Sequence, residues 1–410
     1  MAFTDISSHP LFGPYSSFIK LGRNEKFNGE YASVKNFIES LSVLEAMDDY
    51  KNARSFLYSK CRSSEGTYNS VRIDVERLLL WAWLHKEVSI TMLKRSDIED
   101  YVDFVYSPPT QWIKKGSNKR FVMLSGERMP NSEWCPFSLH LDSDNYSIKS
   151  DTLKQMFANL SSLYEYLVED DYALGNLIPS VRSSCVYLVK NKITQTVLRL
   201  SPDQWDFLLE SITARAGEDS GFERALFIIV TMKVLYLRVS ELCDRPAHKP
   251  TMGDFKNRSE GRFLYVFGKG KKERPVSIPD DYLPYLARYR HYLGLASPWP
   301  AENESTPMLC SFTGKLGNIT ARQLRRIISD AFDFACQELV TLGNVDDAEK
   351  LRQATTHWLR HTGASMDIEA DRPLKHVSEE LGHASMTFTD AVYVQSDLKE
   401  RISSGRKRSI

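Results

Sequence analysis

Residues 356–365 read THWLRHTGAS and place His357, Arg360 and His361 together at the start of a predicted helix. His357 and Arg360 are three positions apart, so on a helix they share one face. Taken alone, this pattern is typical of a capped, solvated first turn. Three other segments of the same half of the chain change that interpretation.

These segments carry the polar side chains that complete a set with the histidine and arginine. They are YLRVSEL with Arg238 and Glu241, GKGKKE with Lys269, Lys271 and Lys272, and LGHASMTFTDAVYV with His383 and Tyr393. Each segment is weak by itself, because a lone arginine is usually a surface residue and a lone histidine is often a core residue. Two arginines, a lysine, two histidines and a tyrosine in this order have one joint task, which is to bind a phosphodiester and attack it.

The chemistry of phosphodiester cleavage explains why these residue types are needed. Arginine donates paired hydrogen bonds to oxyanions and stays charged at any working pH, so it stabilises the charge that develops on the phosphate. A tyrosine hydroxyl is a nucleophile once its proton is removed, and a neighbouring imidazole takes part in that transfer. A lysine with a lowered pKa protonates the leaving oxygen.

A metal-dependent reaction would need a cluster of carboxylates. The sequence has no such cluster near these segments, and it has neither a GxxxxGK[ST] loop nor an HExxH motif. We therefore predict no metal and no cofactor.

The composition indicates a water-soluble protein of more than one domain. The 410 residues exceed one ordinary core, and the formal net charge is zero, so any basic surface must be local. The six cysteines are scattered without a CxxC pair, no apolar segment is long enough for a bilayer, and no signal-peptide pattern is found. These features together predict a cytoplasmic protein.

The order of patterns along the chain predicts a helical first half and a mixed, mostly helical second half. Residues 1–65 form a helical extension, and residues 66–190 form a helical domain whose segment 107–147, rich in proline and glycine, is an irregular insertion. Residues 191–410 form the second domain with a C-terminal tail. Within it, an apolar helix covers 222–237 and a β-hairpin covers 262–278.

Two basic stretches outside the main set are candidate DNA contacts. No acidic residue lies between Asp171 and Asp203, and the insertion contains the basic, aromatic sequence QWIKKGSNKR. An ordinary solvated linker explains the first stretch about as well. The candidates are Arg182, Lys190, Lys192, Arg199, Lys114 and Lys115, with Lys271 and Lys272 of the hairpin turn.

The order arginine, hairpin lysine, His-x-x-Arg, Leu-Gly-His and a following tyrosine resembles the tyrosine recombinase (lambda-integrase) family. The resemblance is firm over about 200–400, weaker over 66–190 and absent over 1–65. It implies a fold that is mainly α with a small β-sheet, made of a helical core-binding domain and an α+β catalytic domain. It also implies cleavage and rejoining of double-stranded DNA through a 3′-phosphotyrosyl link, for integration or excision of a mobile element.

The resemblance also assigns roles to the matching residues. Arg238 and Arg360 bind the phosphate, His357 transfers a proton, His383 donates a further hydrogen bond and Tyr393 is the nucleophile. Glu241 is the carboxylate that supports the site. Lys269 is the general acid, with Lys272 as the next choice. His383 and Tyr393 are ten positions apart, one more than in most relatives, and Tyr393 is the only tyrosine after Tyr292.

The resemblance further implies a tetramer on paired DNA sites, with accessory DNA-bending proteins as additional partners and no membrane. Two other functions remain open. One is a nicking-closing enzyme of the type IB topoisomerase kind, and the other is a catalytically silent DNA-binding regulator with the same fold. The basic tail ERISSGRKRSI is either a disordered end or a segment that docks on a neighbouring protomer.

Overall fold

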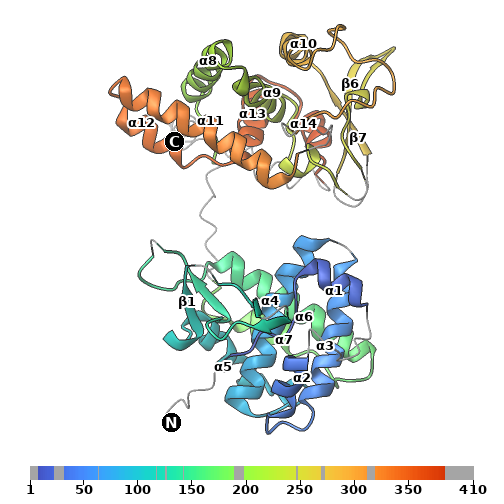
Figure 1. Cartoon of the computed structure of the whole chain (residues 1–410), viewed down its shortest axis with the longest axis vertical. Coiled ribbons are helices and arrows are strands. Elements are labelled where there is room, and N and C mark those ends of the chain that lie inside the picture. The colour runs from blue at the N-terminus through green and yellow to red at the C-terminus, as the bar shows by residue number, and fades with distance from the viewer. Residues whose placement is uncertain are drawn as a thin grey trace, which may run out of the picture. The chain divides into compact units, whose positions relative to one another are not determined.

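The computed structural model divides the chain into two compact units, residues 1–191 and 192–410 (Figure 1). Each unit has its own hydrophobic core. The residues that the structure describes are 8–22, 32–62, 64–116, 118–124, 127–141, 143–188, 198–245, 248–268, 273–311 and 319–383.

The N-terminal unit is built mainly from helices. Its α-helices are α1 (Tyr15–Leu21), α2 (Ala32–Glu39), α3 (Ala46–Cys61), α4 (Glu65–Trp81), α5 (Arg95–Tyr106), α6 (Ser150–Glu169) and α7 (Ile178–Ser184). Helix α4 packs against both α3 and α6, and one apolar cluster runs from Leu11 to Val181. The helices before residue 65 therefore share the core of the helices that follow them.

The insertion between α5 and α6 contains short strands that the sequence did not predict. Strand β1 (Ile113–Lys115) pairs in parallel with β4 (Phe137–Leu139), and β2 (Phe121–Leu124) pairs antiparallel with β3 (Glu127–Pro130). The insertion is anchored by the buried ring of Trp112, which lies edge-on to the partly buried Phe104 at 5.1 Å. Strands of three or four residues are too short for an alternating pattern to reveal them.

The C-terminal unit surrounds helix α9 with helices. Its α-helices are α8 (Pro202–Glu218), α9 (Glu223–Val234), α10 (Leu283–Tyr292), α11 (Ala321–Thr341), α12 (Val345–Arg352), α13 (Thr356–Glu369) and α14 (Leu374–Leu381). All residues of α9 from Arg224 to Met232 are buried, because α8, α10, α11 and α13 pack around it. This burial explains why the α9 sequence is apolar almost throughout.

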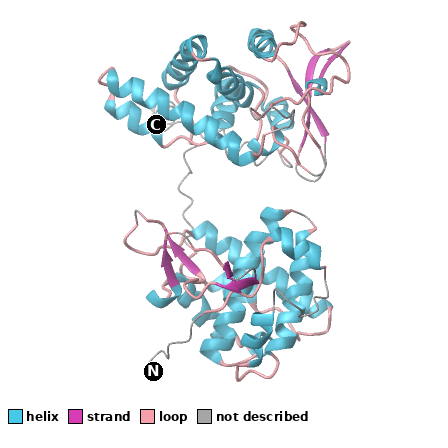
Figure 2. Cartoon of the chain, in the orientation of Figure 1, coloured by secondary structure: helices cyan, strands magenta, loops and turns pink. Residues whose placement is uncertain are grey.

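A three-stranded antiparallel sheet stands beside these helices, in the order β5–β6–β7. The strands are β5 (Phe255–Arg258), β6 (Gly261–Phe267) and β7 (Glu273–Ser277). The β6–β7 pair is the hairpin predicted at 262–278, and β5 adds a third strand. Figure 2 shows the small sheets in magenta among the helices in cyan. The prediction of a mainly α fold with a small sheet is confirmed.

Helix α13, which carries the THWLRHTGAS stretch, lies directly against the end of α9. A Cβ atom at Gly363 would sit 1.9 Å from the carbonyl oxygen of Lys233, so only glycine permits this approach. The contact brings the first turns of α13 next to the segment that follows α9. None of the helices in the described part of the chain has the length and apolar character that spanning a bilayer requires.

Candidate active site

Arg238 is presented by a sharp turn at the end of α9. The helix ends at Val234, Tyr236 adopts a left-handed backbone with φ of 51°, and Arg238 then begins a short 3₁₀ turn, Val239–Glu241. The Arg238 backbone N–H donates to Glu241 Oε2 at 2.8 Å, and its Nη1 donates to Oε1 at 3.1 Å. The arginine side chain remains 32% exposed, so it is held at its base and accessible at its face.

The Glu241 carboxylate is buried at the centre of three guanidinium groups. Arg274 of β7 donates to both oxygens, at 2.8 and 3.0 Å, and Arg360 Nη1 lies 4.0 Å from Oε2. Burial alone would raise the pKa of Glu241, but the Arg274 hydrogen bonds and the nearby positive charges lower that pKa below its ordinary value. Among the described residues of the site, three cationic side chains thus share one carboxylate, which leaves an excess of positive charge there.

Arg360 of α13 is buried and joins three segments. Its Nη1 donates to the carbonyl oxygen of Tyr236, and its Nη2 donates to the carbonyl oxygen of Leu381 at 2.6 Å. Its Nη2 also lies 3.3 Å from His383 Nε2. Because a guanidinium only donates, this histidine nitrogen accepts, and the proton of the neutral ring is assigned to Nδ1.

The three histidines near Arg360 have lowered pKa values. Burial, followed by the charges of Arg360 and Arg238, lowers the pKa of His383 to about 4. Partial burial and the same two arginines lower the pKa of His357, and burial with Arg360 lowers that of His361 to about 4. These imidazoles are therefore neutral at pH 7, and His357, whose side chain stays partly accessible to solvent, is able to accept a proton there.

Two structural features favour glycine at the middle position of the Leu-Gly-His stretch. Gly382 ends α14 in the left-handed region, with φ of 63°. A Cβ atom at this position would lie 3.0 Å from Cδ of Arg274 and 3.1 Å from its Nε. Glycine therefore lets the chain turn and lets the Arg274 side chain pass, with its Nε donating to the carbonyl oxygen of Glu380 at 2.7 Å.

The structure brings five of the predicted residues into one place, namely Arg238, Glu241, His357, Arg360 and His383. Sequence reasoning missed Arg274. Its only sequence signal was its position in the hairpin strand directly after the basic turn. The predicted Lys190, Lys192, Lys269, Lys271, Lys272 and Tyr393 lie outside the described residues.

The described DNA-contact candidates lie at separate places. Arg182 is exposed on α7, and Arg199 pairs with Glu369 at the end of α13. Lys114 and Lys115 form ion pairs with Glu133 at 2.9 Å and Asp144 at 3.7 Å. The positive charges of these two lysines are thus partly offset locally.

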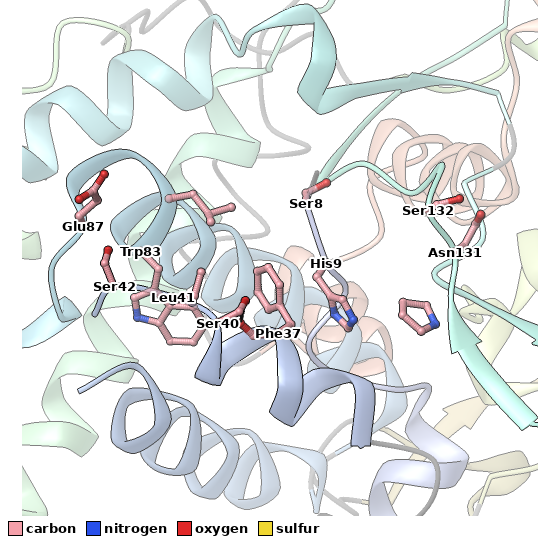
Figure 3. A pocket seen from close by; sticks show the side chains of 12 residues that line it. Ser8, His9, Phe37, Ser40, Leu41, Ser42, Trp83, Glu87, Asn131 and Ser132 are labelled. Carbon is pink, nitrogen blue, oxygen red and sulfur yellow. Dashed lines mark hydrogen bonds between the residues drawn. The ribbon is translucent and has the colours of Figure 1, made fainter. Parts of the chain in front are cut away.

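The N-terminal unit contains a pocket of about 680 Å³. Figure 3 shows His9, Phe37, Trp83 and Asn131 around it. The His9 ring stacks on Phe37 at 4.8 Å, and the Trp83 indole N–H donates to Asp49 at 2.9 Å. Across the described ranges, no group of three or more histidine, cysteine, aspartate or glutamate side chains is arranged to hold a metal ion.

Comparison with known proteins places this site in a family. Residues 199–400, about half of the chain, match the phage integrase family, and the range contains Arg238, Arg360 and His383. The chain belongs to this tyrosine recombinase family. The predicted family membership is therefore confirmed.

Curated tyrosine recombinases match this integrase-family chain over part of their length. Tyrosine recombinase XerC of Thermodesulfovibrio yellowstonii is 31% identical over 40% of this chain and 48% of its own length. XerC of Corynebacterium efficiens is 28% identical over 58% of this chain and 65% of its own length. The chain thus spans between about half and two thirds of these two relatives.

Solved structures are similar over nearly the whole chain. The XerH site-specific recombinase, bound to difH substrate in a pre-cleavage complex, matches with a TM-score of 0.53 and 16% identity. The match covers 98% of this chain and 99% of that one. At this level of identity, the similarity supports the two-unit recombinase fold.

Proposed function

We propose that the chain is a site-specific DNA recombinase that breaks and rejoins double-stranded DNA through a 3′-phosphotyrosyl intermediate. The observation that carries this proposal is the group of Arg238, Arg274 and Arg360 around the single carboxylate of Glu241. Its excess positive charge suits a phosphodiester, and neutral histidines adjoin it. Membership of the phage integrase family supports the same reaction.

In the proposed mechanism, Arg238 and Arg360 bind the non-bridging oxygens of the scissile phosphate. The Tyr393 oxygen attacks phosphorus and forms a new P–O bond, while His357 accepts the proton of the phenol. The bond between phosphorus and the 5′-oxygen breaks, and its electron pair stays on that oxygen. Lys269 donates a proton to the same oxygen. His383 donates a hydrogen bond to the phosphate. Attack by a free 5′-hydroxyl on the phosphotyrosine reverses these steps and rejoins DNA.

Orientation of the arginines before substrate arrives favours this mechanism. Arg360 is fixed by two backbone carbonyls and Arg238 by Glu241, so neither has to reorganise when charge develops on the phosphate. Arg238 also remains partly exposed, so a phosphate on the surface of the unit is able to reach it.

The wider assembly is part of the same proposal. Double-stranded DNA is the substrate, four protomers act on two sites, accessory DNA-bending proteins assist, and integration or excision of a mobile element is the biological role. The proposed contacts with the DNA backbone are Arg182, Lys190, Lys192, Arg199, Lys271, Lys272, Lys114 and Lys115. Six cysteines without a disulfide support a reducing cytoplasm as the location.

A nicked suicide DNA duplex tests the reaction. Attack releases a short strand from this substrate, so religation fails and the covalent complex accumulates. We expect a protein–DNA adduct on denaturing gels, mapped to Tyr393 by mass spectrometry and absent from Tyr393→Phe. The Tyr393→Phe protein should still bind the same DNA, since the arginines are unchanged.

Two other results would contradict the proposal. Relaxation of supercoiled plasmids without any preferred site would favour a nicking-closing enzyme of the type IB topoisomerase kind. DNA binding without an adduct on every site tested, including sites selected from genomic fragments, would indicate a DNA-binding regulator.

A further inference from the structure

Tyr236 occupies a backbone position that normally requires glycine. It follows the last turn of α9 with φ of 51°, in the left-handed region where a helix most often ends on glycine. A side chain with a Cβ atom makes this conformation unfavourable. A bulky aromatic residue persists here only if its surroundings hold it.

The surroundings of the Tyr236 side chain hold it firmly. The side chain is fully buried, its hydroxyl donates to the Asp367 carboxylate, and it accepts from Arg372 Nη1 at 2.7 Å. The ring packs with Ala364, Val377 and Leu381 in a small cluster separate from the main core. The ring and hydroxyl thus fasten Tyr236 to both α13 and α14.

Arg372 links the Tyr236 hydroxyl to the three-stranded sheet through hydrogen bonds. Its Nη2 donates to Glu380 Oε2 at 2.8 Å and to Ser277 Oγ at 3.0 Å. The Ser277 hydroxyl and backbone N–H both donate to Glu380 Oε1, at 2.5 and 3.1 Å. The network therefore connects β7, α14 and the end of α13 to the Tyr236 hydroxyl.

The backbone carbonyl of the same tyrosine accepts a hydrogen bond from Arg360 Nη1. The left-handed turn determines where this carbonyl points, and the hydroxyl network determines where the residue sits. We infer that Tyr236 is a positioning residue, whose anchored ring and left-handed backbone hold the carbonyl that orients Arg360 toward the phosphate. This inference deepens the proposed function and rests on it for its catalytic consequence.

Two variants separate positioning from simple stabilisation. Tyr236→Phe removes only the hydroxyl and its bonds to Asp367 and Arg372. Tyr282→Phe is the matched control, because Tyr282 is also fully buried in the same unit and shares one hydroxyl bond, of 2.8 Å, with Thr231 of α9. Both variants lose a buried hydroxyl, so both should melt at lower temperature.

The rate of covalent-complex formation at saturating suicide DNA distinguishes the two. We expect Tyr236→Phe to react about tenfold more slowly or worse, with DNA affinity within about twofold of wild type. Tyr282→Phe should react at the wild-type rate. Arg372→Met should slow the reaction similarly, and the double variant Tyr236→Phe/Arg372→Met should be no slower than the worse single variant. A wild-type rate for Tyr236→Phe would overturn the inference.

A second measurement does not depend on DNA cleavage. In the full-length protein labelled with ¹⁵N-arginine, the guanidinium Nη–H signals of Arg360, assigned by their loss in Arg360→Lys, report whether that group is held. We expect these signals to exchange faster with water in Tyr236→Phe and to be unchanged in Tyr282→Phe. Unchanged signals in Tyr236→Phe would overturn the inference, even if the wild-type protein cleaved no DNA and the proposed function failed.

Discussion

The contact between α13 and α9 predicts opposite effects for two glycine-to-alanine substitutions. Gly363 faces the backbone of α9, and its added Cβ would lie 1.9 Å from the carbonyl oxygen of Lys233 and 2.9 Å from the carbonyl carbon. Gly217, near the end of α8, has no atom within 4 Å of the corresponding Cβ. Both glycines lie in helices, so both substitutions bring the same gain in intrinsic helix propensity.

Two opposing free-energy terms, helix propensity and overpacking, decide whether each substitution stabilises or destabilises the protein. Alanine gains up to about 1 kcal/mol over glycine in a helix. Overpacking typically costs about 1–3 kcal/mol, and a backbone carbonyl has no rotamer by which to move away, so we take the upper end at Gly363. The net change is then a loss of about 2 kcal/mol for Gly363→Ala and a gain of up to about 1 kcal/mol for Gly217→Ala.

Thermal unfolding of the full-length protein measures both changes. A unit of this size shifts its midpoint by about 2–4 °C per kcal/mol, so Gly363→Ala should lower the midpoint of the C-terminal unit by roughly 4–8 °C. Gly217→Ala should raise it slightly. The reasoning would be refuted if Gly363→Ala unfolded at or above the wild-type temperature, since α13 could then move away from α9 at little cost.

Three further predictions concern the charged groups of the site. Glu241→Gln should lower the free energy of unfolding by about 3 kcal/mol at pH 7 in urea titrations, because three cations lose their buried partner. The pKa of Glu241 is lowered in the folded protein, so its contribution to the free energy of unfolding is present above about pH 4.5 and is lost as the pH falls further. The free energy of unfolding of the variant should therefore depend less on pH in that acidic range. The folded pKa of His361 is about 4, below its ordinary 6.5, so stability should fall as pH falls between these values, and less steeply in His361→Gln when unfolding is followed across that range. Arg274→Lys keeps the charge but not the paired hydrogen bonds, and it should slow covalent-complex formation about tenfold in the suicide assay while DNA affinity changes little.

The sequence was sufficient for the part of the site whose residues have strict spacing. His357 and Arg360 share a helix face, and Arg238 and Glu241 lie within one short turn, so local geometry alone fixes these pairs. Their joint task was inferred from chemistry, because arginines, histidines and a tyrosine together suit one kind of substrate. Helical periodicity likewise predicted the mainly α fold.

Residues that act through contacts distant in sequence were not predictable in this way. Arg274 reaches Glu241 across 33 positions, and Arg372 reaches Ser277 across 95. Tyr236 gave no signal, because the apolar pattern predicted a helix over 222–237. The helix instead ends at Val234, and Tyr236 adopts a left-handed turn. Periodicity also did not reveal that the helices before residue 65 share the core of those that follow, since it shows which face of a helix is apolar and not what covers that face.

The partners of Arg360 and Arg238 differ in a way that suits phosphate binding. Arg360 is oriented by the neutral carbonyls of Tyr236 and Leu381, which fix its direction without cancelling its charge. Arg238 shares the carboxylate of Glu241 with Arg274, which reaches that carboxylate from strand β7. If each arginine had its own carboxylate, the site would be equally ordered but electrically neutral, and a phosphate would have to displace an ion pair in order to bind. A single carboxylate for three cations gives an ordered site that keeps its positive charge, in a chain whose formal net charge is zero.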